Sequence, residues 1–146
     1  MLATLNTASE YGFGAVLAVL PGFGKINTAL ASVIQDPLIN EAITTTTLAG
    51  ITGSASGGMS ISLAAMSETY LSQASKAGIP PEVLHRVASM ASGGMDTLPH
   101  NGAVITLLVI TGLTHKQSYS DIFVMTIIKT MAAFFIIALY KLFGIV

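Results

Sequence analysis

The sequence ASGGMDTLPHNG, which runs from Ala91 to Gly102, places glycines, a proline and ionisable side chains inside an otherwise apolar region. Its first five residues, ASGGM, occur once earlier in the chain, at Ala55 to Met59. Glycines and polar residues that interrupt an apolar helix free backbone groups, which find no water to bond in a lipid bilayer. Such breaks are expected only where they line a cavity or bind a ligand. The two copies therefore predict two broken helices, with the rest of the chain arranged around them.

The composition indicates a protein that lies in a lipid bilayer. Of the 146 residues, 52% are hydrophobic and only 9% are charged, whereas a soluble domain carries about 25% charged residues. The net charge of −1 gives no basic surface for nucleic acid, so no nucleic-acid partner is expected. The chain has no cysteine, which excludes thiolate metal ligands and a cysteine nucleophile. The three histidines lack a zinc-site spacing, so no metal and no organic cofactor are expected.

The lengths of the apolar runs predict an all-α polytopic membrane protein. A crossing needs about 20 apolar residues, and the two short runs on either side of Pro21-Gly22 favour a re-entrant hairpin over residues 7–34 instead. The two ASGGM copies place a first broken helix over 38–77 and a second over 81–114. The run at 122–141 predicts a final plain crossing.

Helix ends are predicted from residues that cap or stop helices. Asp36 with Pro37 fits a helix start, and Gly78 before Pro80-Pro81 fits a helix stop. Asn101 is expected to open the apolar run that follows it. The Ser118-Tyr119-Ser120-Asp121 stretch fits a capping box before the final crossing.

The two breaks are also the predicted binding site. Free N–H groups at the start of a half-helix, with the helix dipole behind them, favour an anion, and glycine lets a ligand approach the backbone closely. This chemistry suits a small hydroxylated carboxylate. The residues expected to contact substrate or ion are Ser54, Ser56, Gly57, Gly58, Ser92, Gly93, Gly94 and Asn101.

Asp96 and His100 are the ionisable candidates for proton coupling, because an ionisable residue inside a membrane segment is a functional hypothesis by default. Other interpretations stay open at this stage. Asp96 can cap the following segment, His100 can be a satisfied polar residue at the membrane surface, and each Gly-Gly pair can serve close helix packing alone.

Three classes of function fit these features. A secondary carrier would use the breaks to bind its substrate and a coupling ion, whereas a channel or structural membrane subunit would use them for conduction or packing. An intramembrane enzyme needs a nucleophile and a base, and Ser92 with His100 is the candidate pair. We expect a carrier and not an enzyme.

Four segments carry a resemblance to a known family: NTASEYGFGAV, LAGITGSASGGMSISLAAM, HRVASMASGGMDTLPHNGAVITLL and TGLTHKQSYSDIF. Together they resemble the C-terminal part of the gluconate permease (GntP) family of bacterial carriers, most closely its D-beta-hydroxybutyrate permease branch. The resemblance implies proton-coupled uptake, with Na⁺ as the other possible coupling ion, of a small hydroxy-carboxylate such as gluconate or 3-hydroxybutyrate. It also implies a multi-pass protein of the bacterial inner membrane, one half of an inverted-repeat fold, and a homodimer in the full-length protein.

Two departures from the family pattern qualify these expectations. The gluconate-type members carry a Ser-His-Val-Asn-Asp stretch where this chain has Pro99-His100-Asn101-Gly102, and this difference weakens gluconate as the substrate. The family's proteins are also much longer. The chain is therefore expected to be a C-terminal fragment without the N-terminal repeat, and inactive in transport if it stands alone.

Overall fold

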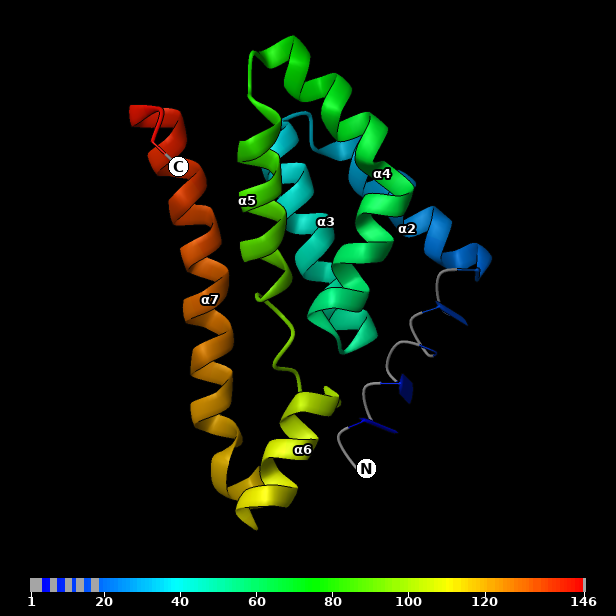
Figure 1. Cartoon of the computed structure of the whole chain (residues 1–146), viewed down its shortest axis with the longest axis vertical. Coiled ribbons are helices and arrows are strands. Elements are labelled where there is room, and N and C mark those ends of the chain that lie inside the picture. Colours follow the sequence, from blue (N-terminus) through cyan, green and yellow to red (C-terminus); the bar gives the residue numbers. More distant parts are fainter. Residues whose placement is uncertain (1–3, 6–7, 10–11, 13–14, 17–18, 146) are drawn as a thin grey trace.

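In a computed structural model, the chain is described except at residues 1–3, 6–7, 10–11, 13–14, 17–18 and 146 (Figure 1). The described residues form six α-helices, so the all-α prediction is confirmed for them. Their bounds are α2 Pro21–Val33, α3 Pro37–Thr52, α4 Ala55–Ala77, α5 Pro81–Ser92, α6 Gly102–Thr111 and α7 His115–Phe143.

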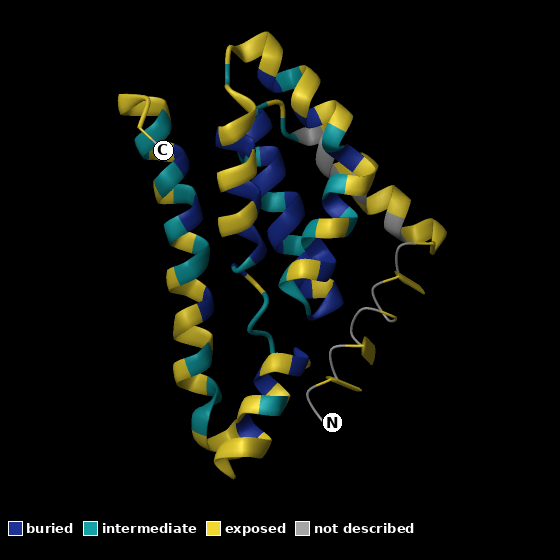
Figure 2. Ribbon diagram, in the orientation of Figure 1, coloured by how far each residue is buried: buried dark blue, intermediate teal, exposed yellow. Residues whose placement is uncertain are grey.

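Helix α3 is the centre of the fold. It packs against α2, α4, α5 and α7, and most of its residues are buried on every side (Figure 2). A helix that carries apolar and hydroxyl residues all round has no face suited to water and is therefore enclosed by other helices. Thr45 donates to Ser62 of α4 at 3.0 Å, and Thr46 donates to the Ala91 carbonyl of α5 at 2.8 Å. These bonds join the core helix to both of its principal neighbours.

Local capping residues set the helix ends, as predicted at three positions. Asp36 accepts from the Ile39 amide at 3.0 Å and precedes Pro37 at the first helical position. Gly78 ends α4 with a φ of 69°, in the left-handed region that glycine adopts without strain. Asn101 caps α6.

The predicted start of the last helix was wrong. Helix α7 begins at His115, and its capping box pairs Thr114 with Gln117, so the Ser118–Asp121 stretch lies inside the helix. The physical reason is that Thr114-x-x-Gln117 is itself a capping box. It stands nearer to Gly112, where α6 ends, and α7 therefore extends seven residues before the predicted 122–141 span.

Among the described residues, α7 is the one helix that is long and apolar enough to cross a membrane, and α6 is a shorter apolar helix of ten residues. Large apolar side chains along α7 are exposed, among them Phe123, Met131 and Phe135. Figure 2 shows this exposed face running along the outside of the helix. An exposed apolar stripe of this length suits contact with lipid or with another protein segment.

The predicted re-entrant hairpin is described only in part. Its first arm falls largely on residues outside the described part of the chain, as do Thr7 and Glu10. Helix α2 covers the second arm but starts at Pro21 itself. The predicted break at Pro21-Gly22 is therefore the first turn of a helix, a position that proline tolerates because the first amides of a helix have no partner there.

Candidate functional site

The first break is a two-residue turn between α3 and α4. Only Gly53, with a φ of 65°, and Ser54 separate the two helices. The Ser54 hydroxyl accepts from the Gly57 amide at 3.2 Å, which supplies the acceptor that the first turn of α4 needs. This first break is therefore short, because Ser56, Gly57 and Gly58 already belong to the first turn of α4.

The second break is longer and runs over residues 93–101, between α5 and α6. It ends at Asn101, whose side-chain oxygen accepts from the Ala103 amide at 2.7 Å and the Val104 amide at 3.3 Å. Asn101 is buried, so its bonds to the backbone stabilise the restart of the chain as helix. This geometry gives the cap of α6 to Asn101 and not to Asp96.

The two breaks lie against each other. The His100 ring donates from Nε2 to the Gly50 carbonyl at 2.9 Å, since a carbonyl oxygen can only accept. A Cβ added at Gly53 would lie 2.9 Å from His100 Cδ2, and one added at Gly50 would lie 3.0 Å from Met95 Cβ. The second break is therefore packed directly on the last turn of α3.

The glycines of the two ASGGM copies fall into two kinds. A Cβ at Gly58 would lie 2.2 Å from the Ala49 amide nitrogen, and one at Gly94 would lie 2.8 Å from Thr46 Cγ2. Close packing against α3 therefore fills the space at these two positions. At Gly57 and Gly93 the nearest atoms are 3.2 Å and 3.5 Å away, so the backbone there is less closely covered.

The serines of the predicted site have different surroundings. Ser54 and Ser56 lie at the start of α4 with their hydroxyl oxygens 3.4 Å apart, and Ser56 is exposed. Ser92 is buried and donates to the Ser89 carbonyl at 2.8 Å within its own helix. The hydroxyls of Ser54 and Ser56 lie next to a helix N-terminus and can still bond a ligand, whereas the Ser92 hydroxyl bonds within α5.

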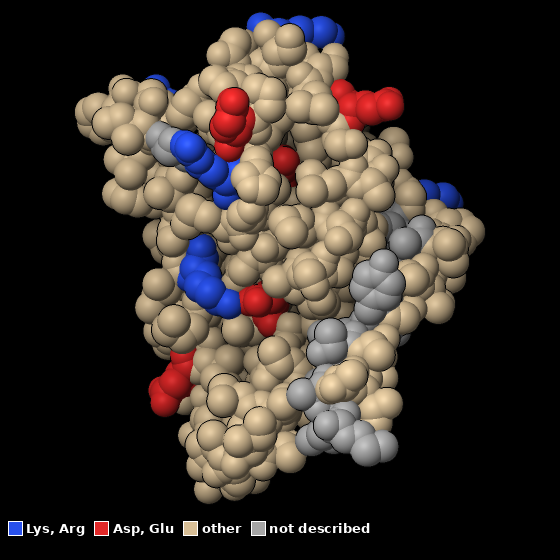
Figure 3. Space-filling model, in the orientation of Figure 1, with Lys and Arg blue, Asp and Glu red and all other residues tan. Residues whose placement is uncertain are grey.

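Asp96 forms an ion pair with Lys129 of α7. A second ion pair joins Asp36, the cap of α3, to Lys141 near the end of α7. Acidic and basic side chains are few on the face shown in Figure 3, and most of that face is uncharged. The two pairs therefore attach α7 to the core at two separated points, and one of them fixes the second break.

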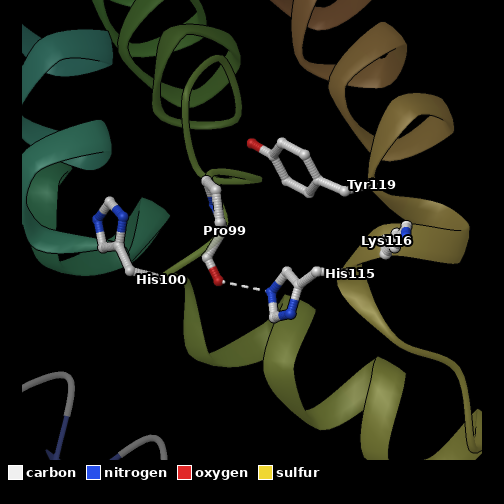
Figure 4. Close-up of a pocket in the computed structure, with 5 residues that line it drawn as sticks. All are labelled: Pro99, His100, His115, Lys116 and Tyr119. Atoms are coloured by element: carbon white, nitrogen blue, oxygen red, sulfur yellow. Dashed lines mark hydrogen bonds between the residues drawn. The ribbon is translucent and has the colours of Figure 1, made fainter.

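A wide, open hollow of about 520 Å³ lies beside the second break, lined by Pro99, His100, His115, Lys116 and Tyr119 (Figure 4). Pro99 lies between the two histidines in this view, and the ring of His115 donates to the Pro99 carbonyl at 2.9 Å. The sequence reasoning singled out His100 but missed His115 and Lys116. Both lie in the first turn of α7, so they come beside the second break only when α7 packs next to it.

The sequence reasoning also missed Glu41. This carboxyl is 1% exposed in the middle of the helix bundle, and its Oε2 atom has no hydrogen-bond partner among the residues that the structure describes. The signal was present, because Glu41 stands within the apolar run that follows Pro37. The rule that singled out Asp96 applies equally to it.

Comparison with known proteins identifies one similar protein by name. The chain is 64% identical over all of its 146 residues to the "Uncharacterized transporter YxjC" of Bacillus subtilis (strain 168). It spans 31% of the length of that protein. No family model matches the chain, and no solved structure matches it. The chain is thus homologous to the C-terminal portion of a protein named as a transporter.

Proposed function

We propose that this chain is the C-terminal part of a secondary transporter in the bacterial inner membrane, which moves a small hydroxy-carboxylate together with protons. The observation that carries the proposal is the 64% identity, over the whole chain, to a protein named as a transporter. The long apolar helix α7 supports a membrane location. The relationship to the gluconate permease family, the lipid bilayer as its surroundings and a homodimer of the full-length protein belong to the same proposal.

The start of α4 is the part of the structure that best suits a carboxylate. A helix of 23 residues begins there, and its first amides and dipole favour a negative charge. The hydroxyls of Ser54 and Ser56 lie side by side at this end. They would donate to carboxylate or substrate hydroxyl oxygens. The remainder of the cavity would come from the rest of the longer protein.

The test is uptake by a hybrid in which this chain replaces the matching portion of the Bacillus subtilis relative. Membrane vesicles containing the hybrid are given an imposed pH gradient and radiolabelled gluconate or 3-hydroxybutyrate. We expect accumulation of one of the two above its external concentration. Equilibration without accumulation would indicate a channel, and no uptake of either would contradict the proposal.

A serine pair tests the place of binding in the same vesicles. Replacing Ser54 and Ser56 together by alanine removes two donors to a charged group, each worth about 1.5–3 kcal/mol. We expect KM for the accumulated carboxylate to rise by at least roughly tenfold. Ser60→Ala, at an exposed position farther along α4, is the matched control and should leave KM unchanged. An equal effect of both changes would remove the start of α4 from the site.

A further inference from the structure

One ionisable side chain of the core takes no part in the breaks. Glu41 lies on α3 and is 1% exposed, and within the described part of the chain its carboxylate oxygen Oε2 has no hydrogen-bond partner. A charged carboxylate removed from water without a partner costs several kcal/mol. A fold retains such a group only when its protonated form, or a change between its two forms, is of use.

A row of buried hydroxyl groups begins at Thr45 of α3, four residues and about one helical turn after Glu41. Tyr70 lies 3.3 Å from the Ser62 hydroxyl, which in turn accepts from Thr45 at 3.0 Å. All three hydroxyl residues are buried. The row lies at the interface between α3 and α4, about one helical turn from Glu41, and offers rotatable O–H groups that can pass or stabilise a proton.

None of the described ion pairs includes Glu41. On the helices packed against α3, the lysines of α7 that form ion pairs are bonded to Asp96 and Asp36. The other charged or titratable groups of α2, α4, α5 and α7 are exposed, apart from Tyr70, Tyr119 and Tyr140: Lys25, Glu68, Lys76, Glu82, His85, Arg86, His115, Lys116 and Asp121. Among the described residues, none of these groups forms an ion pair with the Glu41 carboxyl, and a proton can neutralise this carboxyl without further ligands.

We propose that Glu41 is the proton-binding group of this part of the transporter. Its carboxylate takes one proton from water on one side of the membrane to become the neutral acid. It releases that proton to water on the other side when α4 moves relative to α3. The charge of the site changes by one unit in each step, and the proton gradient supplies the energy. This assignment rests on the proposed transport function and differs from the sequence-based candidates, because Asp96 has Lys129 as its counter-ion and His100 bonds to a backbone carbonyl.

The first experiment measures protonation of the unaltered full chain in membranes. Dicyclohexylcarbodiimide enters the bilayer and reacts with protonated carboxyl groups, and mass spectrometry of the peptides locates the adduct. We expect an adduct on Glu41 whose yield falls as the pH is raised. No adduct at any pH, or a yield independent of pH, would overturn the proposal. Since no variant is involved, misfolding cannot produce either result.

The second experiment separates coupling from binding in the hybrid transporter. Glu41→Gln resembles the protonated form, so labelled substrate should still exchange across the membrane against unlabelled substrate. Accumulation driven by the pH gradient should fall at least tenfold. Glu68→Gln on the exposed side of α4 is the matched control and should leave both activities unchanged.

The remaining outcomes are equally decisive. Accumulation at the unaltered level in Glu41→Gln would overturn the assignment. Loss of both exchange and accumulation, with no recovery in Glu41→Asp, would give Glu41 a structural role and also overturn it. If the unaltered hybrid accumulates no carboxylate, the proposed transport function fails, and the labelling experiment still decides whether Glu41 is a proton site.

Discussion

The two copies of ASGGM are identical in sequence and opposite in structure. The copy at Ala55–Met59 forms the first turn of α4, whereas the copy at Ala91–Met95 ends α5 and enters an irregular segment. The neighbours in the chain account for the difference. Ser54 precedes the first copy and caps a new helix, while Asp96 to Pro99 follow the second, and the proline disfavours helix in the residue before it. A short motif thus permits a helix to start or to stop without deciding which.

Both copies nevertheless keep one role in common. The second glycine of each copy packs closely against α3. Gly58 lies against Ala49, and Gly94 lies against Thr46. The first glycine of each has more room. The repeated motif therefore makes the same packing contact with α3 twice. The two breaks differ in the residues that surround this contact.

The largest effect should come from Gly58→Ala. The new Cβ would lie 2.2 Å from the Ala49 nitrogen and 2.7 Å from the Leu48 carbonyl carbon, and backbone atoms cannot rotate away. We expect the free energy of unfolding of the chain in detergent, followed by circular dichroism, to fall by about 3 kcal/mol, the upper part of the range for overpacked cores. Gly57→Ala is the matched control with a smaller loss. Equal losses would contradict the division of each glycine pair into two kinds.

Gly94→Ala should have an intermediate effect, because its obstacle is a side chain. The new Cβ would lie 2.8 Å from Thr46 Cγ2, and Thr46 can turn only by giving up its bond to the Ala91 carbonyl. We expect a loss of about 1–2 kcal/mol in the same unfolding measurement. Gly93→Ala should be nearly neutral. Adding Thr46→Ala should recover part of the loss, and full additivity of the two changes would argue against their contact.

Substitutions of the two capping residues test whether the helix starts after the two breaks are equally stabilised by their caps. Asn101→Ala removes an acceptor shared by two amides, and Ser54→Ala removes an acceptor used by one. We expect losses of about 1 kcal/mol, larger for Asn101, which is also buried. Hydrogen exchange of the first amides of α6 and α4 would report each loss at its own helix. Faster exchange of the α4 amides in Asn101→Ala, or of the α6 amides in Ser54→Ala, would contradict these cap assignments.

The smallest effect is expected for the ion pair of the second break. Asp96 and Lys129 are both partly exposed, and pairs of this kind contribute about 1 kcal/mol or less. Lys129→Met should lower the stability slightly by leaving Asp96 unpaired, and the double change with Asp96→Asn should restore part of it. A double-mutant cycle in the unfolding measurement gives the coupling between them. A loss larger than that of Gly94→Ala would show that this pair, and not the glycine contact, holds the second break.

The helix content and most helix ends followed from neighbouring residues in the chain. Asp36, Gly78 and Asn101 act on amides or carbonyls a few positions away, so their effect could be predicted without knowledge of the fold. The predicted start of α7 was wrong because Thr114 and Gln117 form a capping box earlier in the chain, so the helix has already begun before Ser118. The first break is shorter than the second because Ser54 caps α4 directly after Gly53, so the glycines of the first ASGGM copy lie within a helix.

The sequence by itself determined the apolar character of the chain, its helices and the presence of two interruptions, since composition and caps act locally. Tertiary structure decided which glycines are covered, that Asp96 has Lys129 as its partner, and that His100 bonds to Gly50. It also decided that Glu41 is enclosed without a partner for Oε2. These properties depend on atoms far apart in the chain, because burial and pairing arise only when helices pack together.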